Sequence, residues 1–225
     1  EKGADLVLSG STSNVEENQT VTITFGGKSY TAKVDADGNW TANVPSSDLA
    51  GLKDGDASVQ VSITNAHGNS ASAGREYSVD ATAPTVTIDT VAGDNVINGS
   101  EAAAGVAISG TTTAEVGQTV TVTFGGNSYT AQVQQGGVWS VNVPGTDLSA
   151  LADNGYTVQV SVSDAAGNPF RAVKAITLDT TPPTVSFNVV AGDDVINSVE
   201  HGQAQIVSGT ATGANVGDKV VITLG

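Results

Sequence analysis

Carboxylate and amide side chains gather in three kinds of segment along this chain, and oxygen-rich sets of this kind bind hard cations such as Ca2+. The first kind is GDNVINGSE at 93–101, which returns as GDDVINSVE at 192–200. The second is an aspartate four residues before a proline, at Asp80 and Asp179. The third is SDAAGN at 163–168. The residues that we predict as calcium ligands are Asp80, Asp94, Asn98, Glu101, Asp153, Asp164, Asp179, Asp193, Asp194, Asn197 and Glu200.

A simpler interpretation of these segments is that Asp, Asn and Gly form turns. The segment DADGN at 35–39 resembles half of an EF-hand loop, but the turn interpretation explains it better. The equivalent segment of the next repeat, QQGG at 134–137, carries no carboxylate and could not bind calcium in the same way. We therefore predict a hairpin turn there. Turn formation does not explain Glu101 and Glu200, since Glu is not a turn former. No candidate is His or Cys, so the sets suit calcium better than zinc or copper.

The composition argues against several other functions. The chain has 8 Lys and Arg against 23 Asp and Glu, a net charge of −15, which leaves almost no cations to bind nucleic acid. Without cysteine it has no disulfide or thiolate site, and no apolar run is long enough to span a membrane. The equivalents of His67 and His201 in the neighbouring repeat are alanines, so we predict no enzyme. The absent initiator Met suggests a piece of a longer protein.

The chain repeats itself. VTITFGGKSYTAKV at 21–34 returns as VTVTFGGNSYTAQV at 120–133, and Trp139 lies 99 residues after Trp40. Repeats of this length are whole domains. The predicted divisions are 1–80, a repeat lacking its first strand; 81–179, a complete repeat; and 180–225, the beginning of a third. Residues 180–199 are the piece that 1–80 lacks. Either chains complete one another head to tail, or the chain is a fragment.

The complete repeat shows seven short alternating runs that read as strands and no sustained helical periodicity. The runs are 86–88, 106–108, 120–124, 128–133, 138–143, 156–162 and 172–178. Seven antiparallel strands in about 100 residues predict an all-β fold of tandem Ig-like β-sandwich domains arranged end to end. Phe25, Trp40, Phe124 and Trp139 should lie in the cores. DNGY at 153–156 is typical of a tyrosine corner, which the first repeat lacks because Ala57 replaces the tyrosine.

The topology of such a sandwich indicates which acidic residues meet. Each junction should bring together the loop between the first two strands of one domain, the linker aspartate, and the loop before the last strand of the next. The first set is Glu1, Asp54, Asp80 and Asp164, and the second is Asp94, Asn98, Glu101, Asp153 and Asp179.

These segments, together with SGTTT at 109–113 and WSVNVP at 139–144, resemble the Ig-like repeats of giant biofilm-associated and type I-secreted adhesins of Gram-negative bacteria. The resemblance covers the whole chain. It implies a long extracellular protein on the bacterial cell surface, with calcium between domains to stiffen the rod. It also implies that each repeat contacts the neighbouring repeats of the same chain. Homotypic contacts or contacts with the biofilm matrix are further possible partners. The first repeat differs from this pattern at Asn65, which occupies the position of the aspartate in SDAAGN.

The leading interpretation is therefore a structural repeat region that mediates biofilm formation or cell adhesion, without nucleic-acid binding or membrane insertion. The alternative is a ligand-binding or carbohydrate-binding Ig-like module. Such sites present exposed aromatic side chains beside polar groups. Tyr77 and Phe170 have no aromatic counterpart in the repeat, so they are the candidates for such a site.

Overall fold

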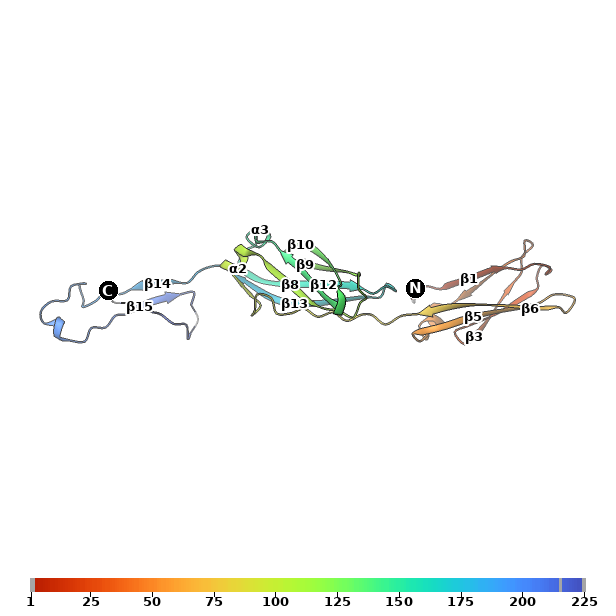
Figure 1. Cartoon of the computed structure of the whole chain (residues 1–225), viewed down its shortest axis with the longest axis horizontal. Coiled ribbons are helices and arrows are strands. Elements are labelled where there is room, and N and C mark those ends of the chain that lie inside the picture. Colours follow the sequence, from red (N-terminus) through yellow and green to blue (C-terminus); the bar gives the residue numbers. More distant parts are fainter. Residues whose placement is uncertain (1–2, 215, 224–225) are drawn as a thin grey trace. The chain divides into compact units, whose positions relative to one another are not determined.

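The structure is a computed structural model that describes residues 3–214 and 216–223. Its chain divides into two compact units. Figure 1 labels the helices and strands along the chain. Unit 1 comprises Glu1–Pro84 with Asp164–Asn168, and unit 2 comprises Thr85–Ser163 with Pro169–Gly225. The prediction that the chain holds parts of three repeats stays a prediction.

The part of unit 2 before residue 180 forms two facing sheets, as an Ig-like sandwich requires. The five-stranded sheet has the order β10-β9-β12-β13-β7, and the two-stranded sheet pairs β11 with β8. Its strands are β7 (Val96–Asn98), β8 (Val106–Thr111), β9 (Thr119–Phe124), β10 (Asn127–Gln132), β11 (Val138–Val143), β12 (Asn154–Ser163) and β13 (Pro169–Asp179). The helical segments are α2 (Gly99–Ala104), α3 (Gly145–Leu148) and the 3-10 turn η1 (Gln135–Gly137). The all-β prediction is confirmed, and six of the seven predicted strands appear.

The first predicted strand is wrong in detail. Val86 makes only an isolated bridge to Thr112, although the neighbouring amide of Thr87 donates to Thr111 O at 2.8 Å. A strand and a helix, β7 and α2, appear instead in the segment expected to be a loop. β7 runs parallel to β13, with Ile97 beside Leu178. A three-residue strand is too short to show periodicity, so the sequence pattern did not reveal it.

The core of unit 2 follows the alternation of its strands. Trp139 and Phe124 are almost fully buried, which confirms their predicted place in the core. Ile97 on β7 is fully buried with them. Tyr156 packs edge-on against Phe124, with ring centroids 5.7 Å apart. Its hydroxyl donates to Ala152 O at 2.8 Å, which confirms the predicted tyrosine corner.

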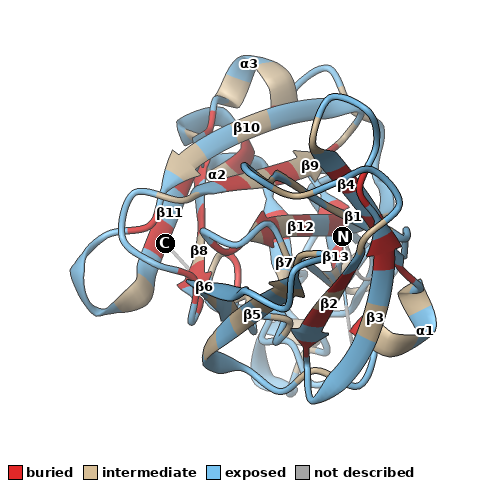
Figure 2. Ribbon diagram, turned by 90° about the vertical axis from the view of Figure 1, so that its right-hand side faces the viewer, coloured by how far each residue is buried: buried red, intermediate tan, exposed pale blue. Residues whose placement is uncertain are grey.

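Unit 1 repeats this arrangement with fewer elements among the residues described. A four-stranded sheet of order β3-β2-β5-β6 faces the pair β1-β4. The elements are β1 (Leu6–Ser11), β2 (Thr20–Phe25), β3 (Lys28–Lys33), β4 (Asn39–Val44), α1 (Ser46–Leu49), β5 (Gly55–Thr64) and β6 (Ser70–Val79). Trp40 and Phe25 are buried as predicted, and Figure 2 shows the buried positions alternating along β2.

The segment 35–39 is the hairpin turn that the sequence predicts. The Asp35 carboxylate accepts from the amides of Asp37 and Asn39, at 3.0 and 2.8 Å. Gly38 adopts a positive φ of 81° and approaches Thr12 O so closely that a Cβ would lie 2.9 Å away. This position therefore requires glycine.

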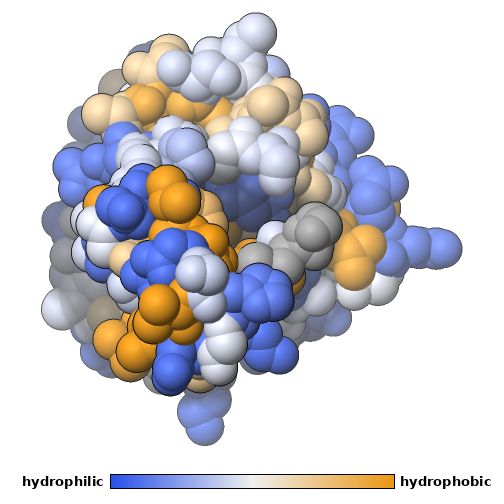
Figure 3. Space-filling model, turned by 90° about the vertical axis from the view of Figure 1, so that its left-hand side faces the viewer, coloured by the Kyte–Doolittle hydropathy of each residue, from blue (hydrophilic) through white to orange (hydrophobic). Residues whose placement is uncertain are grey.

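Beyond β13 the chain forms a hairpin of β14 (Thr184–Phe187) with β15 (Gly209–Thr212), and a 3-10 turn η2 (Glu200–Gly202) lies between them. Apolar side chains of this segment are exposed, and the end view in Figure 3 shows hydrophobic atoms at the surface among hydrophilic ones. Across the described residues, no helix has the length and apolar character that crossing a membrane needs.

Candidate functional site

Asn98 and Glu101 form a capping box at the start of α2. The Asn98 side-chain oxygen accepts from the amides of Ser100 and Glu101 at 3.0 and 3.1 Å. The Glu101 carboxylate accepts from the Asn98 amide at 3.0 Å. Glu101 thus has a structural role that turn formation does not explain, and the Asn-x-x-Glu spacing is the sequence signal for it.

Asp153 and Asp179 lie at the same end of the β-sandwich in unit 2. Asp179 ends β13 directly beside Asn98 in the parallel register with β7. Asp153 accepts from the amide and hydroxyl of Thr180 at 2.9 and 2.7 Å, and from the Thr181 hydroxyl at 2.5 Å. The hydrogen bonds from Thr181 and Thr180 lower the pKa of Asp153 to about 2. The structure therefore brings four of the five residues of the second predicted set to one end of the domain.

The other predicted ligands of the glycine-rich segments serve local turns. The Asp94 carboxylate accepts from the Val96 amide at 2.8 Å. In the second copy, Asp193 accepts from the Val195 amide, and Asp194 accepts from the Val190 amide. Asn197 and Glu200 repeat the reciprocal contacts of the capping box, with 3.0 Å from the Asn197 amide to the Glu200 carboxylate.

Asp80 and Asp164 are connected through Asn168, and all three residues cluster with unit 1. The Asn168 side-chain amide donates to the Asp164 carboxylate at 2.9 Å and to the Asp80 carbonyl at 3.2 Å. Burial alone would raise the pKa of Asp164, but hydrogen bonds from Asn168, Gly167 and Ala166 outweigh it and lower that pKa. Asp54 accepts from the Ala81 amide and the Thr82 hydroxyl.

These residues offer oxygen donors of the kind that calcium binds: carboxylates, a side-chain amide and nearby backbone carbonyls. Among the residues described, no group of three His, Cys, Asp or Glu side chains lies close enough to hold a metal ion. Glu1, a member of the first predicted set, lies outside the described residues. Most of the other candidates already accept hydrogen bonds from the backbone. The turn interpretation therefore accounts for their positions, and calcium binding is a matter for proposal.

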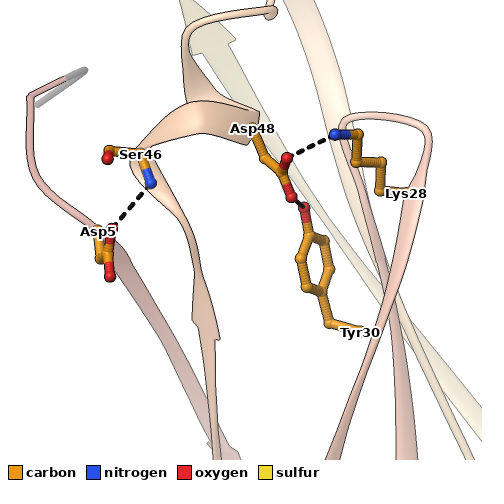
Figure 4. Close-up of polar contacts among 5 residues, drawn as sticks. All are labelled: Asp5, Lys28, Tyr30, Ser46 and Asp48. Carbon is orange, nitrogen blue, oxygen red and sulfur yellow. Dashed lines mark hydrogen bonds and ion pairs between the residues drawn. The ribbon is translucent and has the colours of Figure 1, made fainter.

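A tyrosine–aspartate pair that the sequence did not reveal recurs in both units. Tyr30 donates to the Asp48 carboxylate at 2.7 Å (Figure 4), and Tyr129 donates to Asp147 at 2.6 Å. Burial, followed by the bond to Asp48, raises the pKa of Tyr30 to about 12. Lys28 also pairs with Asp48, and its hydrogen bond is the first cause that lowers the pKa of that carboxyl. Each pair joins a one-turn helix to a strand.

The residues considered for a ligand-binding surface occupy different environments. Tyr77 is partly buried and stacks on Phe25 of unit 1, with ring centroids 4.9 Å apart and an interplanar angle of 15°. Phe170 is 37% exposed near the start of β13. Of the histidines, His67 lies 3.2 Å from the Glu16 carboxylate, and both side chains are exposed.

Comparison with known proteins agrees with this architecture. Residues 89–180 match the model of the bacterial Ig-like domain family. The chain is similar to a solved Ca2+-stabilised adhesin that helps an Antarctic bacterium reach out and bind ice, with 39% identity over 94% of this chain and a TM-score of 0.53. It covers 53% of that structure, so the chain spans about half the length of this relative. No curated protein sequence matches the chain.

A second solved structure comes from a study of how a 1.5-MDa bacterial ice-binding adhesin is retained at the host cell surface. Identity is 33%, the alignment covers 94% of this chain and 70% of that one, and the TM-score is 0.51. The sandwich topology and the repeats define a tandem of Ig-like domains. The chain belongs to the bacterial Ig-like domain family found as repeats in large adhesins. Such domains are structural, so the prediction that this chain is not an enzyme agrees with its family.

Proposed function

We propose that this chain is a repeat region of an extracellular, cell-surface adhesin, and that calcium bound at the ends of its domains stiffens the array. The observation that carries the proposal is the set of oxygen donors at one end of unit 2, in a chain 39% identical to a Ca2+-stabilised adhesin. In this role the repeats hold an adhesive part of the protein away from the cell surface. Such an adhesin can contribute to biofilm formation.

The oxygen chemistry of the donors supports calcium rather than a softer metal. Asn98 and Asp179 stand side by side in the parallel register, and Glu101 is fixed on the Asn98 amide. The Asp153 carboxylate holds the chain immediately after Asp179. When bound, a divalent cation would neutralise carboxylates that otherwise repel one another in a chain of net charge −15.

Thermal unfolding with millimolar calcium and with EDTA tests the proposal. A ligand specific for the folded state adds about 2.7 kcal/mol to the free energy of unfolding at a hundredfold excess over Kd. Asp179→Asn should reduce the calcium-dependent rise in Tm. Asp37→Asn, which removes the same charge from a hairpin turn, should keep that rise.

Small-angle X-ray scattering of the same samples tests the stiffening. Calcium should lengthen the average particle for the wild-type chain and for Asp37→Asn, but less for Asp179→Asn. Identical Tm values and scattering profiles in calcium and EDTA would overturn the calcium proposal.

A further inference from the structure

Two Asn-Gly pairs occur in the sequence, Asn98-Gly99 and Asn154-Gly155, and the structure exposes both in unit 2. In such a pair the backbone nitrogen of glycine can attack the side-chain carbonyl carbon of asparagine, because no Cβ blocks its approach. A C–N bond forms and closes a succinimide ring. The side-chain nitrogen leaves as ammonia, and the proton that it gains replaces the one that the glycine amide loses to solvent. Water then opens the ring to aspartate or isoaspartate.

Asn154 is held in a geometry that favours this attack. The Gly155 amide donates to the Asn154 side-chain oxygen at 2.8 Å, so the attacking nitrogen already contacts the group that it attacks. Rotation about the Cβ–Cγ bond then turns the carbonyl carbon toward that nitrogen. A Cβ on Gly155 would meet no atom within 4 Å, so the ring has room to form. The two residues begin β12, and the end of a strand opens at low cost.

Asn98 is held in a different geometry by the start of α2. Its side-chain oxygen accepts from the Ser100 amide and hydroxyl at 3.0 and 2.6 Å, and from the Glu101 amide at 3.1 Å. Gly99 is also packed, since a Cβ there would lie 3.3 Å from Thr180 O. Ring closure at Asn98 must first break the helix cap. Breaking such a cap makes the reactive arrangement about tenfold rarer.

We propose that Asn154 is a site of spontaneous deamidation in the folded protein, whereas the cap of α2 protects Asn98. The reaction needs only water and is independent of calcium. It gives the sandwich of unit 2 one position that changes chemically with age. This inference goes beyond the proposed function and does not rest on it.

The position of Asn154 gives the reaction a structural consequence. The Tyr156 hydroxyl donates to Ala152 O at 2.8 Å, and Asn154 lies on the segment between them. Isoaspartate routes the main chain through the former side chain and adds one methylene to that segment. The added length disrupts the hydrogen bond of the tyrosine corner, so the modified chain should have a less stable unit 2.

Ageing of the full chain in mildly alkaline buffer tests the proposal, with EDTA present so that no metal protects Asn98. Mass spectrometry with peptide fragmentation assigns each conversion to its residue. In the folded chain Asn154 should convert about tenfold faster than Asn98, or more. In concentrated urea the two should convert at similar rates, because the cap is lost. Equal rates in the folded chain, or a faster Asn98, would overturn the proposal.

Two variants test the mechanism at each pair. Gly155→Ala places a Cβ beside the attacking nitrogen, in space that is open, so it should fold like the wild type and lose the reaction at Asn154. Ser100→Ala removes the hydroxyl donor from the Asn98 side chain and should speed conversion of Asn98 by about two- to tenfold. A Gly155→Ala chain that deamidates at Asn154 as fast as the wild type would contradict the proposed attack.

Thermal unfolding of the aged samples tests the consequence for unit 2. Aged wild-type chain should have a lower Tm than fresh wild-type chain, while Gly155→Ala should keep its Tm on ageing. An equal loss of Tm in the two aged chains would show that the change at Asn154 does not disrupt the tyrosine corner.

Discussion

Each unit has one tyrosine packed against its core phenylalanine, but the two units supply this tyrosine from different strands of the equivalent strand pair. In unit 2, Tyr156 on β12 packs edge-on against Phe124. In unit 1, the position of that tyrosine is Ala57, and Tyr77 on the neighbouring strand β6 stacks on Phe25 instead. Ala57 and Tyr77 face each other across the β5–β6 register. The core thus keeps one tyrosine ring beside its phenylalanine, whichever strand supplies it.

The hydroxyl groups of the two tyrosines differ more than their rings. The Tyr156 hydroxyl donates to Ala152 O, whereas the Tyr77 hydroxyl is buried without a hydrogen-bond partner among the residues described. A buried polar atom without a partner costs free energy. The change of strand therefore keeps the packing of the tyrosine ring but loses the hydrogen bond of the tyrosine corner. In unit 2, β7 also contributes the buried Ile97 to the core; the described residues of unit 1 begin after the equivalent position.

The largest expected effect tests what β7 contributes. Ile97→Ala should lower the free energy of unfolding of unit 2 by about 2–5 kcal/mol, because it leaves a cavity in a closed core. The unit can be followed by tryptophan fluorescence in a Trp40→Phe background, where Trp139 reports on unit 2 alone. Val96→Ala on the same strand, at 38% exposure, is the control and should cost far less. Equal losses in the two variants would show that β7 does not complete the core.

The alternation of the long strands was predictable because each buries one face. The aromatic core positions, the tyrosine corner and the 35–39 hairpin followed from the same local patterns. β7 was not predictable in this way, since three residues, Val96–Asn98, have no period and their partner β13 lies far along the chain. The role of Glu101 required the capping-box pattern rather than a turn pattern.

The candidate site was predictable only in part. Topology correctly brought Asn98, Glu101, Asp153 and Asp179 to one end of unit 2. It did not indicate that backbone amides and threonine hydroxyls would occupy most of these oxygens. Hydrogen bonds to a carboxylate depend on the path of the chain after the strand, as with Thr180 and Thr181, and sequence spacing does not specify that path.

Removing the tyrosine hydroxyl should change the free energy of unfolding differently in the two units. Tyr156→Phe removes a hydrogen bond and should lower the stability of unit 2 by about 0.5–1.5 kcal/mol. Tyr77→Phe removes an unpartnered buried oxygen, so unit 1 should keep its stability or gain. Urea unfolding followed by Trp139 or Trp40 fluorescence distinguishes the units. A loss in Tyr77→Phe as large as that in Tyr156→Phe would mean that the Tyr77 hydroxyl has a partner in solution.

Acid should remove the contribution of the Asp153 carboxylate to the stability of unit 2. Its pKa is about 2 in the folded chain, below the ordinary value of 3.8, so its hydrogen bonds stabilise unit 2 fully above about pH 4. This stabilisation falls as the pH drops toward 2. Asp153→Asn should therefore have a lower Tm than the wild type at neutral pH, and the gap should close between pH 4 and 2. Asp37→Asn serves as the control, and a gap that persists at pH 2 would assign the loss to packing.

The smallest effect concerns the one charged contact that distinguishes the otherwise similar Tyr–Asp pairs. Lys28 pairs with Asp48 in unit 1, while unit 2 has Asn127 at the equivalent position. The Lys28 side chain is 57% exposed, so Lys28→Asn should cost unit 1 no more than about 1 kcal/mol. Asn127→Lys should stabilise unit 2 by a similar amount, because Asp147 is held by Tyr129 as Asp48 is by Tyr30. About 1 M salt screens such pairs and should remove both differences in Tm. A salt-independent loss in Lys28→Asn would place its contribution in the packing of the aliphatic stem instead.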